Sequence, residues 1–301
     1  MNRRTAGLVS GLMAAAILTA PATAQLGERI RTRMALRHQT GGLAPRDIAY
    51  GSDALQHLDF WHATGEPKAA ARIVFVHGGG WKRGDKGSAT RSAKVSHFLA
   101  EGYAVASINY RLVPAATVEE QAKDVAHAIG WLTAHDRDLG IDARRVIVMG
   151  HSAGAHLAAL IGTDMHYLRD AGVPRDAIRG VVLLDGAAYD VPRQIADGNG
   201  FMHDTYLQAL GNDPVRQRAL SPTFQVALPN APSFLILHID RADGASQSQA
   251  LAAALTQAGT SAEIHDVGGT GLRGHMQINR ELGEADYPAT GMVDAWLPGE
   301  F

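Results

Sequence analysis

Ser152 stands within the segment Gly150-His-Ser-Ala-Gly154, in surroundings that suit an attacking nucleophile. The apolar run 145–150 precedes it, and a stretch rich in alanine and leucine follows it. A serine on a tight turn between a strand and a helix presents its hydroxyl above a sheet, provided that its neighbours are small. The N-terminus of the following helix favours developing negative charge. The pattern therefore predicts that Ser152 is a nucleophile.

Three consecutive glycines, Gly78, Gly79 and Gly80, follow a second apolar run and His77. Because glycine has no Cβ, the backbone of such a loop can approach a ligand closely. We expect the N–H groups of Gly79 and Gly80, together with that of Ala153, to donate hydrogen bonds to an oxyanion. We expect His77 to brace this loop by hydrogen bonds and not to act as a base.

Strand-like and helix-like segments alternate along the rest of the chain. Unbroken apolar runs suit parallel strands that are covered on both faces, and they occur at 72–76, 103–110, 145–150, 180–184, 234–239 and 262–267. Helices are expected after a capping box formed by Thr117 and Glu120 and over 246–259. This order predicts an α/β fold with a mostly parallel, doubly wound sheet and helices on both faces. The segment 188–230 lacks clear periodicity and is expected to form a small insertion over the C-terminal edge of the sheet.

The composition narrows the possible chemistry. The chain has 301 residues, of which 46% are hydrophobic, with a formal net charge of -2 and no cysteine. The apolar fraction suits a folded domain, and the charge gives no basic surface for nucleic acid. The absence of cysteine excludes disulfides, thiol nucleophiles and cysteine-ligated zinc. No pattern in the sequence specifies an oligomeric state.

The first residues resemble a secretory signal. Arg3 and Arg4 precede an apolar stretch over 6–20, and Ala22-Thr-Ala24 has the form of a cleavage site. A bilayer span needs about 20 apolar residues, and this stretch is shorter, so no stable membrane insertion is expected. We predict a signal peptide over 1–24, a single domain over 25–301, and a periplasmic or secreted protein.

The two glycine-containing motifs resemble those of a known family. Together with Asn109-Tyr-Arg-Leu112 and Leu220-Ser-Pro222, they resemble the α/β-hydrolase superfamily, and specifically the HGGG-bearing carboxylesterases related to feruloyl-type esterases and kynurenine formamidase. The resemblance covers roughly Asp47 to the C-terminus. It implies a serine–acid–histidine triad in that chain order, ester or amide hydrolysis without a metal or other cofactor, and a site at the C-terminal edge of the sheet.

The chain order implied by this resemblance requires a histidine near the end of the sequence. His275 fits, because it is expected in a loop after the last strand and precedes the run Ile278-Asn-Arg-Glu-Leu-Gly283. The competing candidate, His265, lies inside the expected strand 262–267, which would direct it into packing or solvent.

Two aspartates after the expected strand 234–239 are candidates for the acid. The resemblance places the acid seven residues before the Gln-Ser pair of the next helix, and Asp240 stands seven residues before Gln247. Relative to the strand end, however, Asp240 comes early and Asp243 comes late. We predict Asp240 as the acid with Asp243 as the alternative, the other aspartate serving as a helix cap or as a partner for Arg241.

These residues predict a mechanism and a function. His275 would take the proton of Ser152 during attack, and Asp240 would hold the imidazole in the required tautomer. Activity would then rise with pH as a histidine loses its charge. The predicted function is a serine carboxylesterase that hydrolyses short or aromatic acyl esters through an acyl-enzyme, so the expected partner is a small-molecule ester. The alternatives are an arylformamidase-like amidase and a non-catalytic binding protein with a hydrolase fold.

Three other patterns do not support a different chemistry. Residues 269–274 match G-x-G-x-x-G, but too few residues follow for a dinucleotide-binding unit, and we expect a mobile loop that presents His275. Residues 80–86 resemble part of a phosphate-binding loop, but Asp85 stands where lysine is required. The fourteen histidines include no H-E-x-x-H pattern, so no metal site is predicted.

Overall fold

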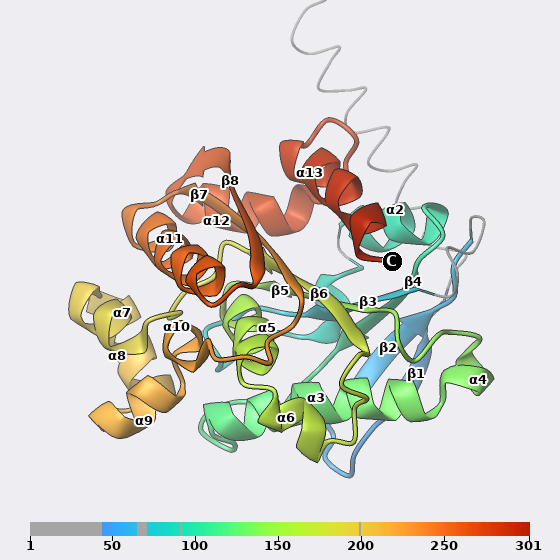
Figure 1. Cartoon of the computed structure of the whole chain (residues 1–301), viewed down its shortest axis with the longest axis horizontal. Helices are drawn as coiled ribbons and strands as arrows, with labels where there is room; N and C mark the ends of the chain where they lie inside the picture. The colour runs from blue at the N-terminus through green and yellow to red at the C-terminus, as the bar shows by residue number, and fades with distance from the viewer. Residues whose placement is uncertain (1–43, 65–70, 91, 199) are drawn as a thin grey trace, which may run out of the picture.

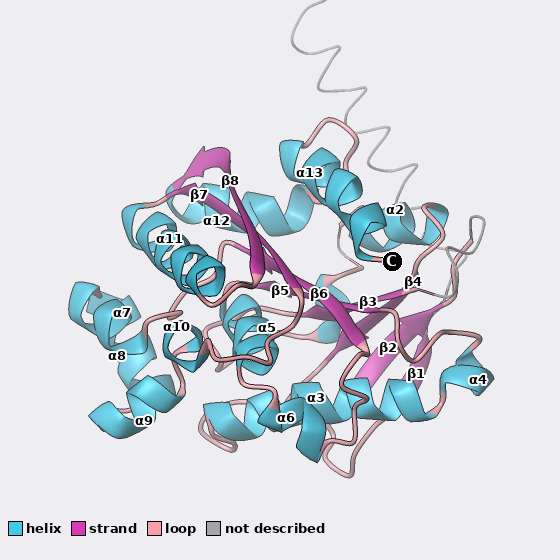
Figure 2. Cartoon of the chain, viewed as in Figure 1, coloured by secondary structure: helices cyan, strands magenta, loops and turns pink. Residues whose placement is uncertain are grey.

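The computed structural model describes residues 44–64, 71–90, 92–198 and 200–301. The predicted signal peptide over 1–24 and the first part of the predicted domain lie outside these residues. The described chain forms a central twisted sheet with helices packed on both sides (Figure 1; Figure 2). Both figures show α2, α12 and α13 above the sheet and α3, α5 and α6 below it.

The described residues form an eight-stranded sheet in the order β1-β2-β4-β3-β5-β6-β7-β8. The strands are β1 (Arg46–Ala49), β2 (His57–Trp61), β3 (Arg72–Val76), β4 (Ala104–Ile108), β5 (Val146–His151), β6 (Ile178–Leu184), β7 (Ser233–Asp240) and β8 (Ser261–Thr270). Strand β2 pairs antiparallel with β1 and β4, and all other neighbours are parallel. The mostly parallel, doubly wound sheet is confirmed, and β3 to β8 coincide with the predicted apolar runs.

Each face of the sheet is covered by its own set of helices. One layer contains α3 (Val118–Ala134), α5 (Ala153–Thr163), α6 (His166–Asp170) and α11 (Ala242–Gln257), and the other contains α2 (Lys94–Ala100), α12 (Gly271–Glu281) and α13 (Pro288–Trp296). The short helix α4 (Asp136–Leu139) follows α3. Within β5, Val146 and Val148 belong to the first core, whereas Ile147 and Met149 belong to the second. Burial on both faces explains why these strands are continuously apolar.

The predicted capping box at the start of α3 is confirmed. The backbone N–H of Glu120 donates to Thr117 Oγ1 at 3.3 Å, and Glu120 Oε2 accepts from the backbone N–H of Thr117 at 2.7 Å. This reciprocal pair satisfies two donors at the N-terminus of the helix. In the described part of the chain, no helix combines the length and the apolar character that a membrane span requires.

The predicted insertion over the sheet edge is helical. It contains α7 (Val191–Asp197), α8 (Gly200–Leu210), α9 (Pro214–Ala219) and α10 (Pro222–Gln225). Figure 1 shows α7, α8 and α9 grouped together at one end of the sheet. Helix α8 contacts the loop that follows β3, because Tyr206 packs edge-on against Trp81 with ring centroids 6.2 Å apart. The insertion therefore lies beside the glycine-rich loop.

Candidate active site

Ser152 occupies a strained turn between β5 and α5. Its backbone has φ 55° and ψ -121°, a conformation that side-chain-bearing residues rarely adopt. A Cβ at Gly150 would lie 2.2 Å from the carbonyl oxygen of Gly154, and a Cβ at Gly154 would lie 2.2 Å from that of Val76. Glycine is therefore required on both sides of Ser152 for α5 to pack so closely against β3 and β5.

His275 is hydrogen-bonded to Ser152. The hydroxyl of Ser152 donates to His275 Nε2 at 3.0 Å, so two residues predicted from separate motifs meet in the structure. His275 lies in α12, however, and not in the predicted loop. A Cβ at Gly274 would lie 2.8 Å from the backbone of Gly269, so the glycines that suggested a loop instead allow α12 to approach β8 closely.

His265 takes no part in this contact. It lies within β8, 43% exposed, with Nε2 3.5 Å from Glu263 Oε2. Its place in a strand, pointing toward solvent, agrees with the expectation.

The acid beside His275 is Asp185, and the prediction of Asp240 or Asp243 is wrong. His275 Nδ1–H donates to Asp185 Oδ2 at 2.5 Å. Asp240 is the exposed last residue of β7. Asp243 lies in the first turn of α11, where its Oδ2 is 2.6 Å from Arg241 Nη1. Only Arg241 separates β7 from α11, so neither aspartate lies on a loop that could extend to His275.

Asp185 is completely buried and is held as an anion. Burial opposes the charge, but the hydrogen bond from His275 and the guanidinium of Arg241, 3.4 Å away, together lower the pKa of Asp185 below its ordinary value. The backbone N–H of Ile239 also donates to Asp185 Oδ1 at 3.4 Å. These neighbours favour the charged carboxylate, which is the form that stabilises an imidazolium.

Backbone strain is concentrated around this site. Among the described residues, the non-glycine positions with positive φ are Trp81, Ser152, Asp185 and Ala188. Two of them, Ser152 and Asp185, are the end members of the hydrogen-bonded chain. Such conformations cost of order 1–3 kcal/mol each and persist where the surrounding structure enforces them. Clustering of this kind is typical of functional sites.

The glycine-rich loop lies against the serine. A Cβ at Gly78 would lie 3.0 Å from Ser152 Cβ, and Gly79 and Gly80 have φ of 130° and 60°. No backbone hydrogen bond of the described chain uses the N–H of Gly79 or Gly80 as donor. Ala153 begins α5, so its N–H lacks an intrahelical acceptor. The N–H groups of Gly79 and Gly80 thus have no backbone acceptor in the described chain, and Ala153 directly follows Ser152.

His77 braces the glycine-rich loop, in agreement with the expectation. It is buried, and its Nδ1–H donates to the carbonyl oxygen of Gly78 at 2.9 Å. Its ring stacks on Tyr110 with centroids 4.4 Å apart, and the Tyr110 hydroxyl donates to the carbonyl oxygen of His77 at 2.8 Å. Burial also lowers the pKa of His77. This histidine is therefore a structural support for the loop.

Sequence reasoning missed His151, which stands inside the serine motif. It is buried, and its Nε2–H donates to the backbone carbonyl of His275 at 2.9 Å. Burial lowers the pKa of His151 to about 3, so the ring stays neutral near pH 7. His151 thus links the turn that carries Ser152 to the helix that carries His275. Its position next to the nucleophile was the available signal.

The arrangement can activate a hydroxyl for attack. In it, the hydroxyl of Ser152 is bonded to an imidazole whose other nitrogen is bonded to a buried carboxylate. An imidazole held in this way can accept the serine proton, and the carboxylate can stabilise the resulting cation. Nearby free N–H groups can stabilise negative charge on a carbonyl oxygen.

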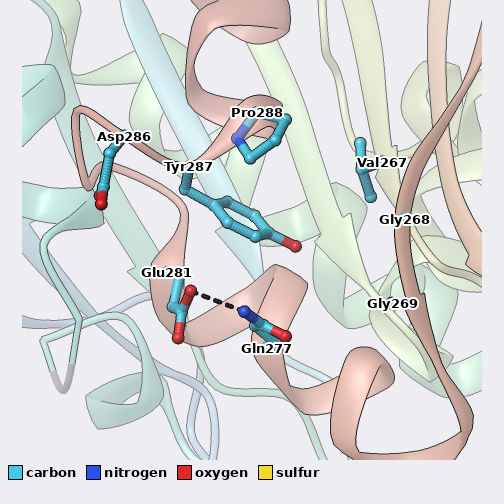
Figure 3. A pocket seen from close by; sticks show the side chains of 8 residues that line it. All are labelled: Val267, Gly268, Gly269, Gln277, Glu281, Asp286, Tyr287 and Pro288. Carbon is cyan, nitrogen blue, oxygen red and sulfur yellow. Dashed lines mark hydrogen bonds between the residues drawn. The ribbon is translucent and has the colours of Figure 1, made fainter. Parts of the chain in front are cut away.

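A separate cavity lies away from these groups. It has a volume of about 290 Å³ and is shown in Figure 3, lined by Val267, Gly268, Gly269, Gln277, Glu281, Asp286, Tyr287 and Pro288. Gln277 donates to Glu281 Oε2 at 2.8 Å along its wall. Ser152, Asp185 and His275 are not among the lining residues, so the cavity is distinct from the serine site. Among all the described residues, the structure contains no group of three or more histidine, aspartate or glutamate side chains that could hold a metal ion.

The fold and the serine turn define the class of protein. The strand order, the parallel core of the sheet and the strained serine between β5 and α5 are those of an α/β-hydrolase. The chain belongs to the BD-FAE family, whose model matches residues 58–255. The resemblance to HGGG-bearing esterases is therefore confirmed.

Relatives of known name are esterases. Esterase LipC of Mycobacterium tuberculosis is 31% identical over 216 residues, which cover 69% of this chain and 53% of that protein. Ethyl acetate hydrolase of Pseudomonas putida is 28% identical over 240 residues, which cover 75% of this chain and 73% of that protein. The chain spans about half the length of LipC and of a second mycobacterial relative, the probable carboxylic ester hydrolase LipM.

Solved structures share the fold. Esterase B from Lactobacillus rhamnosis has a TM-score of 0.67 at 21% identity, over 92% of this chain and 93% of that chain. A truncated carbohydrate esterase from gut microbiota has a TM-score of 0.68 at 23% identity, over 84% of this chain and 94% of that chain. These likenesses establish a common architecture over most of the described residues.

Proposed function

We propose that this protein is a serine carboxylesterase that acts through a covalent acyl-enzyme. One observation carries the proposal, namely the unbroken chain of hydrogen bonds from the Ser152 hydroxyl through His275 to the buried carboxylate of Asp185. The BD-FAE family and the names of its esterase relatives support it.

The reaction follows from the positions of these groups. Ser152 Oγ attacks the ester carbonyl carbon while its proton passes to His275 Nε2, and Asp185 stabilises the imidazolium. The tetrahedral intermediate collapses, and the departing alcohol takes the proton from His275. Water then attacks the acyl-enzyme in the same way, its proton passing through His275, and the carboxylic acid leaves with Ser152 regenerated.

The backbone N–H groups of the glycine-rich loop and of Ala153 stabilise the negative charge that develops during attack. When the carbonyl becomes tetrahedral, its oxygen becomes negative, and the N–H groups of Gly79, Gly80 and Ala153 receive it. Loss of one such donor typically costs about 2.7–4 kcal/mol of transition-state stabilisation. The two positive φ values at Gly79 and Gly80 support this role, because they hold the loop in a conformation that other residues would resist.

We further propose short or aromatic acyl esters as substrates and a periplasmic or secreted location. The similarity to an ethyl acetate hydrolase supports small esters. The N-terminal sequence, with Arg3 and Arg4 before an apolar stretch and an Ala-Thr-Ala site, supports export. Mass spectrometry of the protein from its own host tests the export, since cleavage after Ala24 would leave Gln25 as the first residue.

Steady-state kinetics test the proposed activity. The value of kcat/KM is measured for phenyl acetate and for N-formylkynurenine with the same preparation, alongside Ser152→Ala. The proposal predicts that phenyl acetate is the better substrate and that Ser152→Ala abolishes turnover. Preference for the formyl amide would assign an arylformamidase-like amidase instead. Folded protein that turns over neither compound would favour a non-catalytic binding protein.

A further inference from the structure

We propose that Trp81 and His156 are a pair of positioning residues that hold the glycine-rich loop in its oxyanion-binding shape. The inference rests on the proposed esterase function, because it assigns a role in stabilising that reaction's oxyanion. Neither side chain touches Ser152, Asp185 or His275 through any hydrogen bond of the described chain. Their effect would pass through the backbone of Gly79 and Gly80.

Trp81 ends the run of unusual backbone conformations in this loop. Gly79 and Gly80 have positive φ, and Trp81 follows them with φ 61°, a value disfavoured for a residue with a large side chain. Its indole is nevertheless buried, with 1% exposure. The loop therefore keeps a strained residue where a glycine would be easier, and the contacts of the indole must offset that strain.

The indole is fixed by a specific hydrogen bond. Trp81 Nε1–H donates to His156 Nδ1 at 3.3 Å, and the two rings meet edge to face with centroids 5.3 Å apart. Because an indole nitrogen can only donate, His156 Nδ1 must be the unprotonated nitrogen. The other nitrogen, Nε2–H, then donates to the carbonyl oxygen of Leu220 at 2.9 Å. Both ring nitrogens of a completely buried histidine are thus satisfied in a single neutral tautomer.

The neutral state of His156 is maintained by its surroundings. Burial lowers the pKa of His156 to about 4, so the ring stays uncharged near pH 7. A protonated ring would have a donor at Nδ1 facing the Trp81 donor. The pair therefore holds its geometry throughout the neutral range.

The backbone of Trp81 is held as firmly as its side chain. Its carbonyl oxygen accepts from Gln121 Nε2 at 2.8 Å and from the N–H of Val113 at 3.0 Å. Gln121 lies in α3, whereas His156 lies in α5, one turn after Ser152. Through His156, the loop is attached to α5, the helix that follows Ser152. The same helix therefore positions both the oxyanion donors and the nucleophile.

The pair also connects the loop to the helical insertion. Leu220 directly follows α9, and the Tyr206 ring of α8 packs against Trp81. Lys82, the next residue of the loop, donates to Gln208 of α8. Displacement of the insertion would therefore pull on Trp81, and displacement of Trp81 would shift Gly79 and Gly80.

Replacement of Trp81 by phenylalanine keeps a buried aromatic ring but removes the indole N–H that donates to His156. We compare Trp81→Phe with a matched control, Trp131→Phe, in the last turn of α3, where the indole stacks on His135 with centroids 3.8 Å apart. For phenyl acetate we expect Trp81→Phe to lower kcat roughly 10- to 100-fold with little change in KM, because the loss falls on the transition state. The affinity for a trifluoromethyl ketone, which forms a tetrahedral adduct with the serine, should fall in parallel.

Variants of the histidine provide a second, graded test. His156→Gln retains an amide donor for Leu220 and an oxygen for Trp81, whereas His156→Leu retains neither. We expect His156→Gln to keep more of the wild-type kcat than His156→Leu does. ¹⁵N NMR of histidine-labelled wild-type protein should show His156 as the neutral Nε2–H tautomer at pH 7, and this readout does not depend on activity.

The outcomes separate this inference from the proposed function. Wild-type protein that hydrolyses no ester would overturn the proposed function, whatever the tautomer of His156. An active wild type with Trp81→Phe equal to Trp131→Phe in kcat and in ketone affinity would overturn the positioning role alone. A protonated or Nδ1–H His156 at pH 7 would also overturn it.

Discussion

His275 Nδ1 lies 2.5 Å from Asp185 Oδ2, and Asp185 directly follows β6, the strand next to β5 in the sheet. The nucleophile and the carboxylate thus come from the ends of two adjacent parallel strands. The base is brought to them from α12, which follows β8 at the edge of the sheet. Asp240, the last residue of β7, and Asp243, in the first turn of α11, make no hydrogen bond to the base.

Replacement of Asp185 by asparagine should therefore be far more costly than replacement of Asp240. Asparagine preserves the shape but favours the wrong tautomer of the imidazole, an effect that costs about 10⁴-fold in kcat in serine proteases. We expect Asp185→Asn to lower kcat for phenyl acetate by roughly that factor. Asp240→Asn is the matched control and should stay within a few-fold of the wild type, because Asp240 is exposed. A large loss in the control with little loss in Asp185→Asn would reassign the acid.

Gly154, two residues after Ser152, should tolerate no side chain. A Cβ at Gly154 would lie 2.2 Å from the carbonyl oxygen of Val76, whereas a Cβ at the exposed Gly291 in α13 would meet no atom within 4 Å. Overpacking typically costs about 1–3 kcal/mol, and we expect Gly154→Ala to lose at least that in urea unfolding. Gly291→Ala should instead gain roughly 0.4–1 kcal/mol, since alanine reduces the entropy of the unfolded chain. Equal stabilities of the two variants would contradict the close packing at the serine turn.

Lys94 should make the stability of the protein depend on pH. It is completely buried in α2, where its Nζ donates to Asn279 Oδ1 at 2.6 Å and lies 4.1 Å from the centre of the Phe75 ring. Burial lowers the pKa of Lys94 to about 7 from an ordinary value of 10.5. Between these two values the unfolded chain binds more protons than the folded one, so the free energy of unfolding rises with pH.

Comparison with Lys94→Met isolates this contribution. Methionine cannot titrate, so the free energy of unfolding of the wild type minus that of the variant should increase with pH by up to about 1.4 kcal/mol per unit above pH 7. Urea unfolding of both proteins at pH 6, 7.5 and 9 measures the difference. A difference that stays constant across these values would show that the ammonium is not held away from water.

Much of the fold could be predicted because burial on both faces leaves a clear pattern. The continuous apolar runs that became β3 to β7 are typical of parallel strands covered by helices on either side, whereas β8, at the edge of the sheet, is largely exposed. Strands β1 and β2 were not predicted, because β1 has only Ile48 buried and β2 is interrupted by half-buried polar residues.

Site residues could be predicted where a local turn determines the residue types, and could not where contacts between distant segments decide which residue takes part. Ser152 and the glycines around it follow from the steric demands of one tight turn. The only sequence signal for Asp185 is weak, because it is simply an aspartate directly after the apolar run 180–184. Whether Asp185 or Asp240 pairs with His275 depends on which strand end faces α12 in three dimensions. His275 was expected in a loop because of the glycines before it, and only the close approach to β8 explains why they begin a helix.

Covalent labelling of Ser152 tests whether His275 activates this serine as a nucleophile. Folded wild-type protein and His275→Gln are treated with a fluorophosphonate, and the rate and position of labelling are read by mass spectrometry of peptides. We expect the label on Ser152 of the wild type, and we expect the variant to be labelled at least about 100-fold more slowly because its serine lacks a base. A wild-type Ser152 that stays unlabelled, or that reacts no faster than in the variant, would contradict this expectation.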